Sequence, residues 1–272
     1  MWAIYKKAMR DSQRTMLWLS IGLGLYALLM VSFYPMMQAQ EDSYKEMLKS
    51  YPKEMMSVFM GGDFDPDTYS LTDIGTFVQT YFMLYGIVII GALAVVQAFN
   101  AITNAERDGT LDVMMSLPVS RRQMFTGRAL ATISMILIVL TFSIAGFWAG
   151  SLIWTEFDIN LIELAVGLYG SFFLLTVFTG LSYLLAAVVP SSKHYAGAVA
   201  YLALIGTYLI YSLSGLSDAL DAIKPLMAYD YYSAGTAIND GAQWGDWAVL
   251  AVVSVLFFGL AWWFIDRKEL AV

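Results

Sequence analysis

The chain has 272 residues, of which 59% are hydrophobic and 14% charged, and its mean hydropathy is +0.63. This composition excludes an ordinary soluble protein and predicts a polytopic membrane protein. Cysteine is absent and histidine occurs once, which excludes a disulfide framework, a thiol nucleophile and a thiolate metal site and leaves little scope for an imidazole metal cluster.

Residues 1–15 combine a basic face with an apolar one. The basic face carries Lys6, Lys7, Arg10 and Arg14. This pattern predicts a short amphipathic helix that lies on the surface of an anionic leaflet. A signal-peptide n-region is the alternative, but the apolar run that follows is too long for a signal peptide, and several equally long runs come after it.

Six apolar runs are long enough to cross a bilayer, for which about 20 residues are needed. They are Met16 to Met37, Phe77 to Phe99, Ala129 to Ile153, Leu164 to Val189, Tyr195 to Leu216 and Trp247 to Ile265. None contains an ionisable side chain other than tyrosine. We therefore expect an all-α fold with six transmembrane helices in one transmembrane domain, residues 1–272.

The distribution of charge predicts the orientation of these spans, because Lys and Arg are retained on the cytoplasmic side. With a cytoplasmic N-terminus, the inner segments carry eleven of the 15 basic residues and six of the 22 acidic ones, a balance of +5. The outer segments then carry the remaining four basic and sixteen acidic residues, a balance of -12. The prediction is a multi-pass protein of the cytoplasmic membrane with both termini in the cytoplasm.

The longest segment between spans, residues 38–76, is predicted to lie outside. Apolar residues recur in it at helical spacing, which predicts a surface helix that restarts at Pro52. Asp63, Asp65 and Asp67 resemble the start of a calcium loop, but the glycine and the bidentate glutamate of that loop are missing. An acidic turn is therefore favoured over a metal site.

A densely charged segment lies between the second and third runs. Gly109 is suited to end the arriving helix, and Thr110 to cap a new short one. Pro118 would end that short helix, and Ser120 with Gln123 has the form of a capping box that opens the next long helix.

The short helix would present an apolar knob to a partner. The knob comprises Leu111, Met114, Met115 and Leu117, rimmed by Asp108, Asp112, Arg121 and Arg122. The loop 190–194 lies on the same predicted face, and its His194 is interpreted as a solvated residue rather than a ligand.

The sequence contains no motif for nucleotide binding and no candidate catalytic group within the predicted spans. No Gly-x-x-x-x-Gly-Lys-Ser/Thr motif occurs, so any ATP that drives this protein binds to another chain. The predicted spans hold no buried carboxylate of the kind that proton- or sodium-coupled carriers use, and Asp73 and Glu163 lie only at their edges. Neither a catalytic site nor a bound metal is expected.

The basic N-terminal helix, the six spans and the stretch Glu106 to Gln123, ERDGTLDVMMSLPVSRRQ, together resemble the permease subunit of an ATP-binding-cassette transporter of the second exporter type. In that family a Glu, a Gly-Thr-Leu and a Leu-Pro-Val-Ser-Arg at similar spacing mark the loop between the second and third spans. The resemblance implies that Glu106 to Pro118 forms a coupling helix seated in a cleft of a separate ATPase subunit.

Further expectations follow from this resemblance. The residues implied in ATPase coupling are Glu106, Asp108, Gly109, Thr110, Leu111, Met114, Met115, Leu117, Pro118, Arg121 and Arg122. A second, smaller contact is implied for Pro190, Ser191, Lys193 and His194, and re-entrant outer helices for Lys224 to Gly235. Two permeases, identical or related, and two ATPases would form the working unit. ATP and magnesium would bind to the ATPase, and no cofactor or nucleic acid to this chain.

Two other hypotheses remain open. A self-contained secondary carrier or channel is compatible with the six spans. A membrane scaffold or sensor that moves nothing could use the acidic outer segment as its interaction surface. The sequence itself indicates neither the substrate nor the direction of transport. The resemblance implies export, and the lipids of the membrane would contact the spans.

Overall fold

The computed structural model describes residues 1–52, 55–56, 70, 72–107, 120–189, 195–214 and 217–267, with the backbone alone for 104–107 and 195–196. Helices make up nearly all of the regular structure in these ranges. Their bounds are α1 Trp2–Ala39, α2 Glu41–Lys49, α4 Ile74–Val78, the π-helical turn η1 Gln79–Met83, α5 Leu84–Arg107, α7 Arg121–Ser151, α8 Leu161–Val188, α9 Tyr195–Leu213, α10 Asp218–Ile223, the 3₁₀ turns η3 Lys224–Leu226 and η4 Ala228–Tyr231, α11 Ala234–Asn239 and α12 Trp244–Phe264.

Five helical segments are long and apolar enough to cross a membrane. They are α1, the continuous run α4–η1–α5, α7, α8 and α12. The described apolar part of α9, Gly197–Leu213, is shorter than these five. The prediction of a polytopic all-α protein is thus supported by five spans, and α9 corresponds to the fifth predicted run, Tyr195 to Leu216, without reaching the same length.

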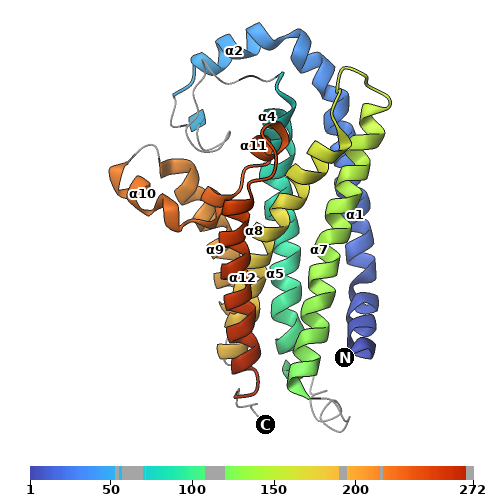
Figure 1. Cartoon of the computed structure of the whole chain (residues 1–272), viewed down its shortest axis with the longest axis vertical. Coiled ribbons are helices and arrows are strands. Elements are labelled where there is room, and N and C mark those ends of the chain that lie inside the picture. The colour runs from blue at the N-terminus through green and yellow to red at the C-terminus, as the bar shows by residue number, and fades with distance from the viewer. Residues whose placement is uncertain are drawn as a thin grey trace.

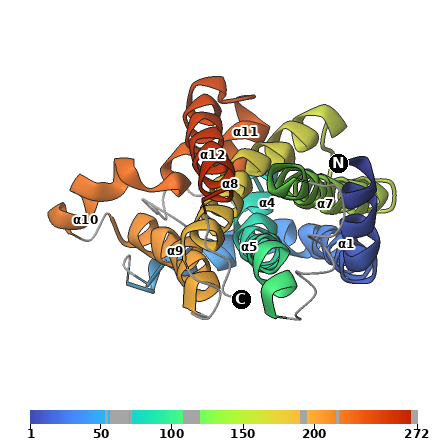
Figure 2. The same ribbon diagram turned by 90° about the horizontal axis from the view of Figure 1, so that it is seen from below.

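The long helices stand side by side in one bundle (Figure 1). The start of α1 and the end of α12 lie at one end, which we call the base, whereas α2, α4 and α11 lie at the opposite, distal end (Figure 1). Seen from below, α5 and α8 lie between α1 and α7 on one side and α9 and α12 on the other (Figure 2). Helix α8 packs against α5, α7, α9 and α12, and its Leu164, Leu168 and Leu174 are fully buried.

The interface between α1 and α7 depends on small residues. A Cβ atom on Gly146 would overlap the backbone carbonyl of Gly24, and one on Gly150 would lie 2.8 Å from the Val31 side chain. Small residues allow helix backbones to approach closely, which is how helices commonly associate in lipid. These two helices are therefore held in direct backbone contact.

The N-terminal segment is not a separate helix. Residues 2–39 form one continuous helix that contains both the predicted amphipathic helix and the first predicted span. Ser12 and Met16 are buried, and Met16 packs with Ala131 and Met135 of α7, while the Tyr5 hydroxyl donates to Ser134 Oγ over 3.2 Å. The predicted separate amphipathic helix over residues 1–15 is therefore corrected to the first part of α1. The physical reason is that one stripe along residues 5–16 packs against α7, and no helix-breaking residue separates it from the span.

The predicted surface helix after the first span is present as α2. Glu41 and Lys45 form an ion pair of 2.8 Å along it, and the backbone amides of Met55 and Met56 both donate to the Pro52 carbonyl. A turn therefore begins at Pro52, as expected. The acidic stretch with Asp63, Asp65 and Asp67 lies outside the described residues.

Candidate functional site

The base of α7 is defined by the capping box that the sequence predicts. The Ser120 hydroxyl accepts from the Gln123 backbone amide over 3.2 Å, and the Gln123 side chain accepts from the Ser120 amide over 3.4 Å. Both donors would otherwise be unsatisfied at a helix start. Helix α7 therefore begins rigidly at Arg121, directly after the charged segment that the sequence singles out.

Arg122 connects this start of α7 to the end of α12. Its Nε lies 2.6 Å from Asp266 Oδ2, and its guanidinium carbon lies 4.0 Å from the centre of the Trp262 ring. Both side chains of the ion pair are more than a third exposed, so the pair stabilises the fold only modestly. We call Arg122, Trp262 and Asp266 the base clamp, since they join the first turn of α7 to the last turn of α12 and the residues just after it.

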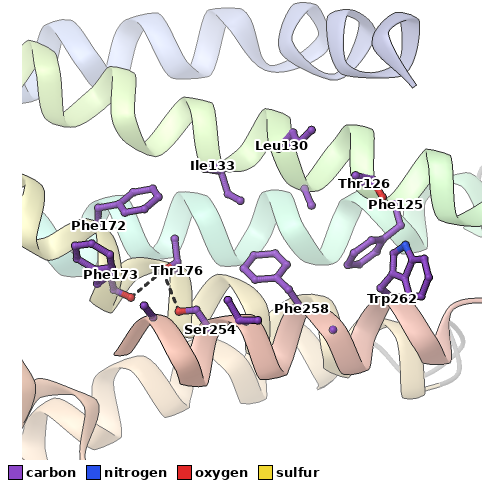
Figure 3. A pocket seen from close by; sticks show the side chains of 14 residues that line it. Phe125, Thr126, Leu130, Ile133, Phe172, Phe173, Thr176, Ser254, Phe258 and Trp262 are labelled. Atoms are coloured by element: carbon purple, nitrogen blue, oxygen red, sulfur yellow. Dashed lines mark hydrogen bonds between the residues drawn. The ribbon is translucent and has the colours of Figure 1, made fainter. Parts of the chain in front are cut away.

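Above the base clamp lies an apolar groove of about 600 Å³ between α7, α8 and α12 (Figure 3). Phe125, Leu130 and Ile133 of α7 face Phe258 and Trp262 of α12 across it, with Phe172 and Phe173 of α8 at its far end (Figure 3). None of its 14 lining residues is ionisable. The groove is suited to an apolar group such as a lipid chain and offers no chemistry for a reaction.

Several polar side chains within the spans join one helix to another. Thr176 of α8 lies 3.0 Å from the Ser254 hydroxyl of α12, and Thr132 of α7 lies 3.0 Å from the Tyr183 hydroxyl of α8. Ser182 donates to the Val95 carbonyl of α5 over 2.8 Å. Because these groups are satisfied by neighbouring helices, their role is packing rather than the lining of a polar path.

A second organised region lies at the distal end, where α11 packs between α4 and α8. The Gln79 side chain, in the π-helical turn, accepts from the Ala234 amide at the start of α11 over 2.6 Å. Asp73 caps α4 through the Thr76 amide at 2.7 Å and also accepts from Asn239 Nδ2 over 2.8 Å. Asp73 is therefore a structural cap that fixes α11, which argues against a role as a carrier's proton site.

Glycines make this insertion of α11 sterically feasible. A Cβ atom on Gly167 would overlap the Ile238 side chain, and one on Gly75 would lie 2.7 Å from the Gly235 carbonyl oxygen. The Tyr232 hydroxyl, just before α11, donates to the Gly167 carbonyl over 2.8 Å. The region in which re-entrant helices were expected thus consists of η3, η4 and α11, tied to α4 and α8.

Comparison with known protein families decides the class of this bundle. The model of the family described as ABC-2 family transporter protein matches residues 2–270. The chain belongs to the ABC-2 transporter family. No curated protein matches its sequence significantly. The chain is thus the multi-pass membrane permease of an ATP-binding-cassette transporter, and ATP hydrolysis in such a transporter belongs to a partner ATPase.

Most of the predicted coupling residues of this ABC-2 permease lie outside the described residues. These are Asp108, Gly109, Thr110, Leu111, Met114, Met115, Leu117 and Pro118, together with the second predicted contact at Pro190, Ser191, Lys193 and His194. Glu106 lies in the last turn of α5, with its backbone alone described. Arg121 and Arg122 lie in the first turn of α7.

The base clamp is the feature that sequence reasoning missed. The sequence predicts Arg122 on the rim of the apolar knob, whereas the structure pairs it with Asp266 of the tail after α12. A local signal was available, because Trp262 and Asp266 are four residues apart and so share one face of a helical end. Their partner, 140 residues away in the chain, could not be found from that spacing.

Proposed function

We propose that this permease exports its substrate across the cytoplasmic membrane, driven by ATP that two copies of a separate ATPase hydrolyse. Family membership supports the transporter class, and the excess of Lys and Arg in the segments at the base supports a cytoplasmic base. In the same proposal α9 is the sixth span. The start of α1 and the end of α12 lie at the same end of the bundle, which requires an even number of crossings (Figure 1).

The observation that carries the proposal is that α5 ends and α7 begins at the base, so that residues 108–119 connect two helix ends there in the chain (Figure 1). We assign it the role of coupling helix, with Leu111, Met114 and Met115 as its apolar contact to the ATPase. Methionine is suited to a surface that keeps contact while it shifts. Glu106 and Asp108 would orient the segment by capping or pairing, and the loop 190–194 would add the smaller contact.

The structure suggests how motion at this segment would spread. Helix α7 starts two residues after it, in a satisfied capping box, and would move with it as a rigid body. The base clamp would transmit the displacement to α12, and the close contact of Gly24 with Gly146 would transmit it to α1. With two permeases, identical or related, such a tilt would change the side to which their shared cavity opens.

The test is the double substitution Met114→Asp and Met115→Asp in the permease purified with its ATPase. Two buried charges at an apolar contact should abolish co-purification or reduce ATP turnover at least about tenfold. Met47→Asp makes the same change on α2, where Met47 is exposed, and should leave both unchanged. Wild-type assembly and turnover in the double variant would remove the proposed coupling role.

A further inference from the structure

The apolar groove between α7, α8 and α12 is open at the side of the bundle. Leu130 of α7 and Val255 of α12 line it and are 42% and 70% exposed, so it is not an enclosed cavity of the core. All three helices are long and apolar enough to cross a membrane. In a bilayer the open side of the groove therefore meets lipid or another protein, and an apolar group has to fill it.

The hydroxyl groups in the wall of the groove are already hydrogen-bonded within the protein. Thr126 donates to the Arg122 carbonyl over 2.8 Å. Thr176 donates to the Phe173 carbonyl over 2.8 Å, and the Ser254 hydroxyl lies 3.0 Å from that of Thr176 (Figure 3). A hydrocarbon chain, which needs no hydrogen-bonding partner, suits this wall better than a polar substrate does.

The base end of the groove carries side chains that are typical of a membrane–water interface. Trp262 lines the groove there, and the Arg122 guanidinium carbon lies 4.0 Å from the centre of its ring. The Arg267 guanidinium carbon lies 3.6 Å from the centre of the neighbouring Trp263 ring. Tryptophan and cationic side chains concentrate at the level of the lipid headgroups. We therefore place the base end of the groove at that level, with the rest of the groove in hydrocarbon.

The length of the groove matches one leaflet. On α12 its lining residues extend from Ala251 to Trp262. At a rise of about 1.5 Å per residue this stretch is roughly 16 Å long. The hydrocarbon core of a bilayer is about 30 Å thick, so one leaflet takes up about half of it. A helix from another protein would cross the whole core, whereas a groove that ends halfway fits one chain of a lipid.

The two helix ends beside the groove carry an excess of positive charge. Arg121 and Arg122 begin α7. Asp266 and Arg267 follow α12, so three cations and one carboxylate lie at these ends. Arg122 is four residues before Thr126 and so shares the face of α7 that lines the groove. Its side chain is 42% exposed and its guanidinium has five N–H donors, so it can donate to Asp266 and to a second acceptor.

We propose that the groove binds one acyl chain of an anionic phospholipid from the leaflet at the base, and that the lipid phosphate accepts from Arg122. In the orientation proposed above, this is the cytoplasmic leaflet, whose anionic lipids attract cationic side chains. The bound chain would fill the space between α7 and α12 directly above the base clamp. Lipid binding requires no ATPase, so it does not depend on the coupling role.

The headgroup contact is tested by native mass spectrometry of the full-length permease in detergent, titrated with dioleoyl phosphatidylglycerol or with dioleoyl phosphatidylcholine. Wild type should bind one phosphatidylglycerol at least about tenfold more tightly than phosphatidylcholine, and Arg122→Gln should lower this preference about fivefold. Asp266→Asn is the matched control: it breaks the same ion pair but keeps the cation, so the preference should stay the same or increase.

Gly259 of α12 allows a direct test of the groove. It lines the groove, and a Cβ atom on it would have no atom within 4 Å, so Gly259→Leu should fold and fill part of the space. Binding of both lipids should weaken at least about tenfold. Gly206→Leu on α9 also adds a side chain in open space, but outside the groove, and should bind like wild type. Without lipid, Gly259→Leu should unfold no earlier than wild type, since leucine favours a helix more than glycine does.

Three results would overturn the proposal. The first is equal affinity of the wild type for the two lipids, and the second is wild-type lipid binding by Gly259→Leu. The third is a dimer of the wild-type permease that retains no lipid and that Gly259→Leu dissociates, because the groove would then be an interface between two copies of the chain. Loss of ATPase binding in the Met114 and Met115 variant would leave lipid binding unchanged, so the two proposals fail separately.

Discussion

Arg122 links two helices that the sequence separates by more than a hundred residues. Its guanidinium pairs with Asp266 and stacks on Trp262, while its neighbour Phe125 packs edge to face on Tyr183 of α8 at 5.1 Å. The first turn of α7 is thus connected to both α12 and α8. Because each single contact is worth little, its importance lies in the connection between helices rather than in stability.

We predict a measurable but small coupling between Arg122 and Asp266. A double-mutant cycle with Arg122→Gln and Asp266→Asn should give a coupling energy of about 0.2–1 kcal/mol in the free energy of unfolding. The same variants should lower transport more than they lower ATP turnover, since the clamp would carry motion from α7 to α12. Arg267→Gln, which removes only the cation–π contact with Trp263, serves as the control. Additive single effects on both quantities would contradict this role.

Gln79 is the residue that holds the start of α11. Gln79→Leu would leave the Ala234 amide without its acceptor, which should cost about 1–3 kcal/mol and speed hydrogen exchange at α11. Gln97→Leu is the matched change, because among the described residues the Gln97 side chain accepts from the Ser12 hydroxyl alone, and that hydroxyl can rotate towards another acceptor. Exchange mass spectrometry should show faster exchange of α11 in the first variant alone.

At the level of whole elements, the α1–α7 pair depends on glycine. Gly146→Ala would place a methyl group against the backbone of Gly24, and overpacking of this kind costs about 1–3 kcal/mol. Gly22→Ala lies in the same helix pair with no atom within 4 Å of the added methyl group, and should be neutral or slightly stabilising. Thermal unfolding of the two variants in detergent checks the difference, and equal behaviour would contradict close helix contact.

The attachment of α2 should depend on pH through Glu41. Hydrogen bonds from Lys45 and from Ser70 hold the pKa of the Glu41 carboxyl below its usual value. Because the pKa of Glu41 is lower in the folded state than in the unfolded state, its ionised carboxylate stabilises α2 at any pH above the unfolded-state pKa. This stabilisation disappears as the pH falls through the folded-state pKa. Glu41→Gln should therefore unfold at a lower temperature than wild type at neutral pH, and the difference should vanish in acid.

Element positions were predictable where the signal is local. Apolar runs determined the spans, and Ser120 with Gln123 determined the start of α7. Features that depend on distant partners were not predictable: the continuous α1 follows from packing of Ser12 and Met16 on other helices, and the π-helical turn at Gln79 accompanies the insertion of α11. The predicted coupling helix stays a prediction, since residues 108–119 lie outside the described ones.

On the scale of the whole molecule, the bundle separates two tasks. At its base the clamp joins the start of α7 to the end of α12, and at its distal end α11 packs on α4 and α8. Hydrophobic packing between the helices does not favour transport in either direction across the membrane. The direction of transport would therefore be set by the ATPase at the base. The central claim is therefore that the segment 108–119 contacts that ATPase on the cytoplasmic side.

The chain contains no cysteine, so a single Met114→Cys gives this permease one reactive thiol without further changes. In intact cells that express the transporter, this cysteine should resist a membrane-impermeant maleimide, and a short bifunctional reagent that enters the cell should cross-link it to the ATPase. Met47→Cys on α2 should show the opposite pattern, labelled from outside and not cross-linked. Labelling of Met114→Cys from outside, or its failure to cross-link to a co-purifying ATPase, would contradict the account.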